Sequence, residues 1–115
     1  LMQIQEATSQ LCSALRQSPE YMEYARLKAE IDGDSGLKAL VKEYKRLQMA
    51  VQMRMLAGQG MEDDEGKRFQ QLSALLFADQ RTSGYLLAEM RLQKVMAEIF
   101  EQITRASGME MPMPV

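Results

Sequence analysis

The sequence contains no histidine and no tryptophan, and its single cysteine is Cys12. Histidine is the commonest general base and the commonest metal ligand in proteins. Its absence excludes Ser–His and Cys–His nucleophilic sites, and zinc sites of the Cys/His type, built from this chain alone. One cysteine cannot form an internal disulfide, which fits a reducing compartment. Several common classes of catalytic and metal site are therefore excluded.

Long apolar runs and a large net charge of either sign are also missing. No apolar run approaches the roughly 20 residues that span a bilayer. The first residues, LMQIQEATSQLC, lack the basic start and apolar centre of a secretion signal. We therefore expect a soluble, cytoplasmic protein that does not bind membranes. The formal net charge of −2 lacks the basic excess of a nucleic-acid-binding domain, so direct nucleic-acid binding by the isolated chain is disfavoured.

The chain is long enough to form one core, and it is rich in methionine. Its 115 residues fit a single domain. Methionine occurs 11 times, against four tyrosines and three phenylalanines, which favours cores and interfaces made of flexible aliphatic side chains. We predict one helical domain over residues 1–108 and a short Met/Pro-rich tail over 109–115, since a helix cannot continue through Pro112 and Pro114.

The pattern of residues predicts an all-α fold. Strand-type alternation is missing, and good helix formers dominate. Turn-forming clusters divide the chain into four to five helices, over 2–17, 19–31, 36–58, 63–78 and a last helix ending near 106. Asp34 or Ser35 is the predicted N-cap of the third helix, and Asp79 or Ser83 that of the last.

Apolar residues recur at three- and four-residue steps along the two long helices. We interpret them as a core or self-association seam comprising Leu40, Tyr44, Leu47, Val51 and Met55 in one helix and Leu92, Val95, Ile99 and Ile103 in the other. More apolar residues lie off these seams, at Met49, Met53 and Leu56 and at Leu87 and Met90. A helix that is apolar on several faces must be buried on several sides. We therefore expect a homodimer or higher oligomer.

Two further burial predictions follow from the same periodicity. In the helix over 63–78, Phe69, Leu72, Leu75 and Leu76 are expected to face inward. In the first helix, Cys12 lies at the edge of the apolar stripe and is predicted to be a small buried hydrophobe.

The segment LAGQGMEDDEGK, residues 56–67, resembles a ligand loop because glycines and carboxylates occur together. A calcium loop with Gly66 at its sixth position would place Met61 first and Leu72 twelfth, where oxygen ligands are required. A phosphate loop needs a strand before it and Gly-Lys-Ser/Thr within it, and both are missing. We predict instead that Gly58 or Gly60 ends one helix and that acidic residues begin the next. No metal or cofactor is expected.

One side of the helix over 36–58 carries four cations, and two interpretations remain open. Lys38, Lys42, Lys45 and Arg46 could form a weak anion or RNA patch, or simply a solvated face. The lack of interleaved aromatic residues and the acidic total favour the solvated face. The alternative function is an RNA-associated factor that uses this stripe within an oligomer.

Three stretches together resemble a known family. They are EATSQLCSALRQSPEYMEYARLKAEI, LVKEYKRLQMAVQMRMLAGQGMEDDE and YLLAEMRLQKVMAEIFEQI. Their shared order is a Ser-Pro-Glu-Tyr cap at 18–21, a central Gln48, a Gly-containing acidic tip at 58–65 and the pair Ala88–Glu89. In this order the chain resembles the YlbF/YmcA family of small helical bacterial proteins, including its YheA-like branch.

The resemblance implies an all-α fold with an antiparallel hairpin of long helices, usually in dimers or higher oligomers. It implies a regulatory protein, not an enzyme, linked to competence, sporulation and biofilm formation. Implied partners are other copies, other family members and a complex that assists ribonuclease Y in RNA processing. That complex carries iron–sulfur clusters, but the cysteine-bearing C-terminal region is not matched by the tail SGMEMPMPV. The family has no catalytic residues to transfer.

Overall fold

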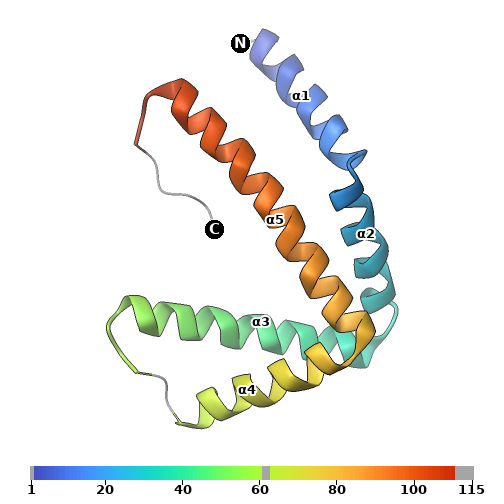
Figure 1. Ribbon diagram of the computed structural model, residues 1–115, viewed down its shortest axis with the longest axis vertical. Helices are drawn as coiled ribbons and strands as arrows, with labels where there is room; N and C mark the ends of the chain where they lie inside the picture. The colour runs from blue at the N-terminus through green and yellow to red at the C-terminus, as the bar shows by residue number, and fades with distance from the viewer. Residues whose placement is uncertain (1, 61–62, 111–115) are drawn as a thin grey trace. The chain divides into compact units, whose positions relative to one another are not determined.

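The computed structural model describes residues 2–60 and 63–110, and over these residues it contains five helices and no strand. They are α1 (Met2–Arg16), α2 (Pro19–Asp32), α3 (Ser35–Leu56), α4 (Asp63–Ala78) and α5 (Gln80–Ser107), as Figure 1 shows. The predicted all-α fold with four to five helices is confirmed.

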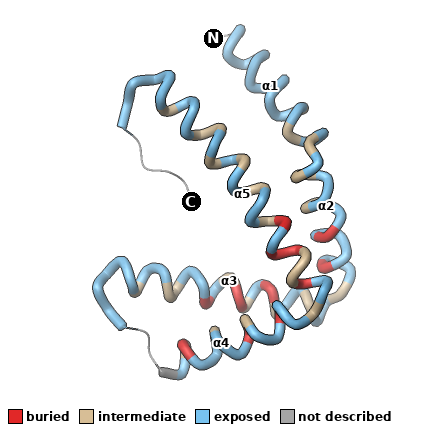
Figure 2. Tube along the Cα trace, viewed as in Figure 1, coloured by how far each residue is buried: buried red, intermediate tan, exposed pale blue. Residues whose placement is uncertain are grey.

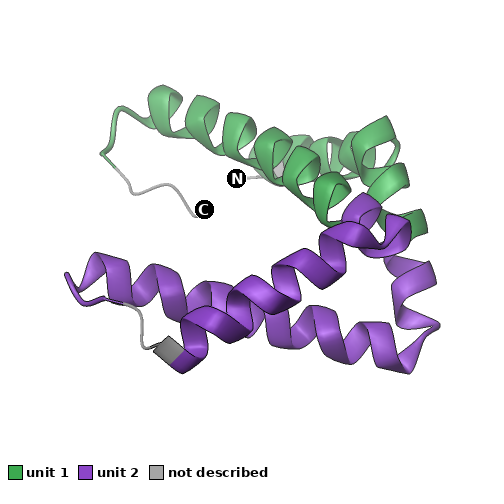
Figure 3. Ribbon diagram, turned by 60° about the horizontal axis from the view of Figure 1, so that its bottom comes forward, with its two compact units in different colours: residues 1–27, 86–115 green, residues 28–85 purple. Residues whose placement is uncertain are grey.

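The helices fall into two compact units (Figure 3). Unit 1 comprises residues 1–27 and 86–115, and unit 2 comprises residues 28–85. The single domain expected over 1–108 stays a prediction. Of the predicted tail over 109–115, residues 111–115 lie outside the described residues, as do residues 61 and 62 of the predicted acidic tip.

Short polar side chains begin α3 and α5, and a glycine follows the end of each. The Asp34 carboxylate accepts hydrogen bonds from the amides of Gly36 (3.1 Å) and Leu37 (3.2 Å), so it caps α3. At the start of α5, Asp79 Oδ1 accepts from the amide of Arg81 at 2.8 Å. After α3 and α5, Gly58 and Gly108 adopt the left-handed φ values of +73° and +71° that favour glycine. Local turn chemistry thus sets the limits of the two longest helices.

In unit 2, α3 and α4 run in opposite directions and pack together (Figure 1). The Tyr44 ring stacks on Phe69, with centroids 5.3 Å apart, and meets Phe77 edge-on at 6.4 Å. The buried side chains of this core are Ile31, Val41, Tyr44, Leu47, Leu72, Leu76, Thr82 and Tyr85. α5 lies mostly in unit 1, so the hairpin expected between the two long helices stays a prediction.

Burial in unit 1 is confined to one part of its helices (Figure 2). Its buried side chains among the described residues are Leu27, Leu86 and Ala88. Residues 3–16 of α1 are exposed or half-buried throughout, and so are residues 89–107 of α5. The apolar stripes of these two segments are therefore covered only in part.

Two burial predictions were wrong. Leu75 is 54% exposed, because α3 covers α4 on the side of Leu72 and Leu76, and Leu75 projects about 100° from its neighbour Leu76. Cys12 is exposed, because no other part of the chain covers α1 closely enough to bury any side chain over residues 3–16.

No helix in the described ranges is both long and apolar enough to cross a membrane.

Candidate functional site

The predicted seam of α3 lies mostly inside unit 2. Tyr44 and Leu47 are buried, Leu40 and Val51 are half-buried, and Met55 is 70% exposed. The buried part of the seam therefore belongs to the packing of unit 2, and Met55 is the member of the set most accessible to another molecule.

The predicted seam of α5 is less covered. Leu92, Val95 and Ile99 are half-buried, and Ile103 is 57% exposed. All four lie in unit 1, beyond Ala88, where the described part of α5 has no buried side chain. This seam has apolar area available for contact with another chain.

The off-seam apolar residues of α3 are open to solvent. Met49 and Met53 are 61% and 63% exposed, and Leu56 is 89% exposed. At about 100° per residue these three side chains share one sector of α3, directed away from the buried Tyr44. On α5, Leu87 and Met90 are exposed as well. Each of the two helices thus carries a second apolar surface that the chain itself leaves open.

Two of the four predicted cations of α3 have partners within unit 2. Lys38 and Lys42 are exposed. Lys45 donates a hydrogen bond from Nζ to the Tyr85 hydroxyl at 2.7 Å and lies 4.9 Å from the centre of that ring. Arg46 pairs with Glu43 at 2.7 Å. Two of the four side chains are therefore engaged within unit 2.

The Arg46–Glu43 pair changes the titration of both partners. The hydrogen bond from the guanidinium lowers the pKa of the Glu43 carboxyl below its usual value. The same bond raises the pKa of Arg46. Both groups are thus held in their charged forms, and Glu43 supplies a negative charge within the predicted basic stripe.

One carboxylate of the acidic tip, that of Glu65, contacts Arg54 of α3. Arg54 Nη2 lies 2.9 Å from Glu65 Oε1, a charge–charge contact without the alignment of a hydrogen bond. Asp64 is exposed. Among the side chains of residues 3–60 and 64–110, no group of three or more metal-ligating residues lies close enough to hold an ion. What the described part of the tip shows is a contact that holds α4 to α3.

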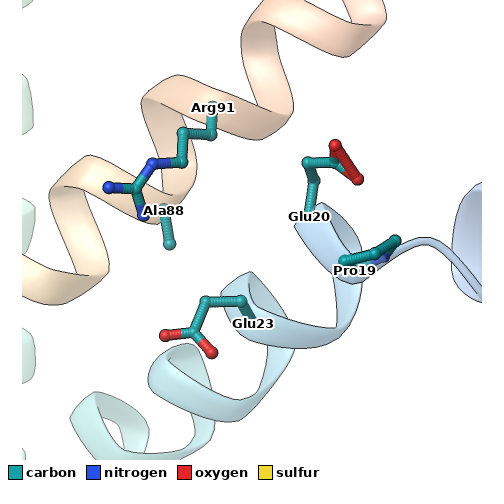
Figure 4. A pocket seen from close by; sticks show the side chains of 5 residues that line it. All are labelled: Pro19, Glu20, Glu23, Ala88 and Arg91. Atoms are coloured by element: carbon teal, nitrogen blue, oxygen red, sulfur yellow. The ribbon is translucent and has the colours of Figure 1, made fainter.

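Unit 1 contains two neighbouring depressions between α2 and α5. One, of about 250 Å³, is lined by Pro19, Glu20, Glu23, Ala88 and Arg91 (Figure 4). The other, of about 270 Å³, is lined by Glu20, Arg91, Lys94, Val95 and Glu98. Both depressions are lined by acidic, basic and apolar residues. The mixed charge suits contact with a protein surface better than binding of a singly charged small ligand.

Sequence reasoning did not anticipate the depressions or the aromatic cluster around Tyr44. The residues of each feature come from different helices: the depressions lie between α2 and α5, and the cluster joins Tyr44 of α3 to Phe69 and Phe77 of α4. Periodicity indicates which face of a helix is apolar but does not identify the helix that covers it.

The comparisons with known proteins agree with this fold. Residues 4–106 match the family described as "Control of competence regulator ComK, YlbF/YmcA". A UPF0342 protein of Caldicellulosiruptor saccharolyticus is 30% identical over 97 residues, which is 84% of this chain and 81% of that protein. The UPF0342 protein STH1710 of Symbiobacterium thermophilum is 24% identical over 102 residues, covering 89% and 91%.

A solved structure shows the same fold. The "Protein of Unknown Function (DUF964) from Bacillus stearothermophilus" is similar with a TM-score of 0.72 over 91% of this chain and 92% of that one, at 16% identity. The family match spans nearly all the helices described above, and it confirms the resemblance found in the sequence. The chain therefore belongs to the YlbF/YmcA family.

Proposed function

We propose that this chain is a non-enzymatic regulatory adaptor that acts through self-association and contacts with other proteins. Its family is described as controlling a competence regulator, which is a regulatory activity. By resemblance, the proposal extends to roles in competence, sporulation, biofilm formation and ribonuclease Y-dependent RNA processing. Other family members and an RNA-processing complex are the proposed partners besides a second copy.

The observation that carries the proposal is apolar surface left open on several helices. Ile4 of α1 is 67% exposed, and Met96 and Ile103 of α5 are 49% and 57% exposed. The open residues of α3 lie in unit 2, so each unit exposes several large apolar side chains, and exposed apolar surface is typical of contact sites for other proteins. Association with another protein surface would remove it from water, which is favourable in proportion to the apolar area buried.

The RNA-associated alternative has less support. It relied on four cations acting together, and Lys45 and Arg46 instead contact Tyr85 and Glu43. The exposed Lys38 and Lys42 that remain are too few for strong electrostatic attachment to a phosphate backbone.

Sedimentation velocity across a range of protein concentrations tests the proposal. We expect species heavier than the 13.1 kDa monomer at micromolar concentration. Because association follows mass action, the heavier fraction should grow with concentration. A strict monomer throughout that range would contradict the proposal.

A further inference from the structure

Two exposed stripes of side chains run along α3 and α5. The outer stripe of α3 consists of Lys38, Lys42, Lys45, Met49, Met53 and Leu56, which are exposed except for the half-buried Lys45. The outer stripe of α5 consists of Leu87, Met90, Lys94, Glu98, Glu101 and Arg105, all exposed. Residues at three- and four-residue steps share one face of a helix, so each set forms one continuous stripe.

The two stripes have the same spacing when one is read backwards. From Lys38 to Leu56 the steps are 4, 3, 4, 4 and 3, and from Arg105 back to Leu87 they are the same. Two helices lying antiparallel would therefore bring the six positions together in pairs over about 27 Å. Matching side-chain rows are what close packing of two helices requires.

The chemistry of the aligned positions is complementary along most of this length. At one end, Leu56 meets Leu87 and Met53 meets Met90. Further along, Lys42 meets Glu101, and Lys45 lies opposite Glu98 while keeping its contact with Tyr85.

The remaining positions limit the match. Met49 lies opposite Lys94, whose aliphatic stem can cover apolar surface. At the far end Lys38 would face Arg105, and these two positive charges repel each other.

We propose that the outer stripe of α3 in one copy docks antiparallel on the outer stripe of α5 in a second copy. This inference rests on the proposed self-association and names the surfaces that it uses. A two-fold axis would form the contact twice and close a dimer, whereas other arrangements would repeat it from copy to copy. Lys94 and Glu98 also line the depression of about 270 Å³, so the α5 stripe borders this depression of unit 1.

The other pairings of the same stripes are poorly matched. An antiparallel pair of α3 stripes would place Lys38 against Leu56 and Lys45 against Met49. An antiparallel pair of α5 stripes would place Leu87 against Arg105. A parallel pairing of α3 with α5 would place Lys38 against Leu87 and Leu56 against Arg105. Apolar–charged mismatches disfavour these three, so the antiparallel α3–α5 contact is the specific one.

Charge reversal with rescue tests the contact. Lys42→Glu and Glu101→Lys should each raise the dissociation constant of self-association by about tenfold, because like charges then face each other. The double variant carrying both changes restores opposite charges, and we expect it to return within about twofold of the original value. Circular dichroism shows whether each variant keeps its helices, and sedimentation equilibrium gives the constants.

Lys38→Glu is the matched control, since this lysine lies on the same stripe but opposite Arg105. Its reversal should leave association unchanged or strengthen it. If the native chain associates and neither single reversal weakens it, or the double variant is not restored, the docking mode is wrong while self-association stands. If the native chain is monomeric, both proposals fail.

Discussion

At the scale of single residues, Asp34 joins two segments of unit 2. Its Oδ1 accepts both amide hydrogen bonds that begin α3, and its Oδ2 lies 3.5 Å from Arg81 Nη1 at the start of α5. The amide bonds satisfy donors that the first turn of a helix otherwise leaves unpaired. The ion pair is exposed and contributes little. We therefore attribute the stabilising effect of Asp34 chiefly to the cap.

Asp34→Ala should lower the free energy of unfolding by about 1 kcal/mol, the usual effect of removing an N-cap. Urea denaturation followed by circular dichroism measures the loss. Asp32→Ala is the control, because Asp32 makes an exposed pair with Lys28 at 3.1 Å, which is worth about 0.5 kcal/mol or less. Equal losses in the two variants would show that the cap has no special role.

The caps could be predicted because they depend on neighbouring residues in the sequence. Asp34, Asp79 and Gly58 each act within a few positions of themselves. The contact of Lys45 with Tyr85 could not be predicted, because it depends on how α3 meets the start of α5.

At the scale of elements, α4 shows how far one neighbouring helix covers another. Leu76 is 1% exposed, whereas its neighbour Leu75 is 54% exposed. Both are leucines in the same helical turn, so their difference comes from direction alone. Only the side of α4 directed at the core of unit 2 gains stability from burial.

Leu76→Ala should destabilise the protein by about 2–5 kcal/mol, because it removes a fully buried side chain and leaves a cavity. The matched change Leu75→Ala should cost less than about 1 kcal/mol, since that side chain is largely solvated already. Thermal and urea denaturation of both variants compare them directly. A similar loss in both would contradict the assignment of the core.

Helix limits were predictable, but the width of each buried face was not. The helix predicted over 63–78 is the observed α4, Asp63–Ala78. Leu75 was wrongly assigned to the core because an apolar period gives the direction of a stripe without showing how much of it a neighbour covers.

At the scale of the whole molecule, charge argues against direct RNA binding. The net charge is −2, and Glu43 adds a carboxylate within the cationic part of α3. Association with a phosphate backbone depends on several cations that neutralise phosphates together. The chain offers Lys38 and Lys42 on that face, next to an ion pair that is already neutral.

We expect a fluorescent single-stranded RNA to show no salt-sensitive binding to the protein in an anisotropy titration at low salt. The double variant Lys42→Glu with Lys45→Glu should give the same flat titration. Binding that weakens steeply with added salt, and that this variant loses, would instead favour the RNA-associated function.

The family could be recognised from the sequence, because its features are local and follow a fixed order along the chain. The Ser-Pro-Glu-Tyr cap is one such feature, with Ser18 Oγ accepting from the Tyr21 amide at 3.2 Å. The proposed self-association surfaces could be named from the sequence only as excess apolar residues. Their separation into a buried face at Tyr44 and an open face at Met53 required the positions of the other helices.

The open methionines also make these surfaces chemically changeable. Met49, Met53 and Met90 are each more than half exposed in the single chain, so peroxide can reach them there without any unfolding. Oxidation to the sulfoxide turns an apolar side chain into a polar one, and methionine sulfoxide reductases reverse the change. An oxidant can therefore lower the apolar character of these parts of the two outer stripes, and with it the affinity of the proposed contact. A reductase can restore both, while the core of unit 2 stays intact.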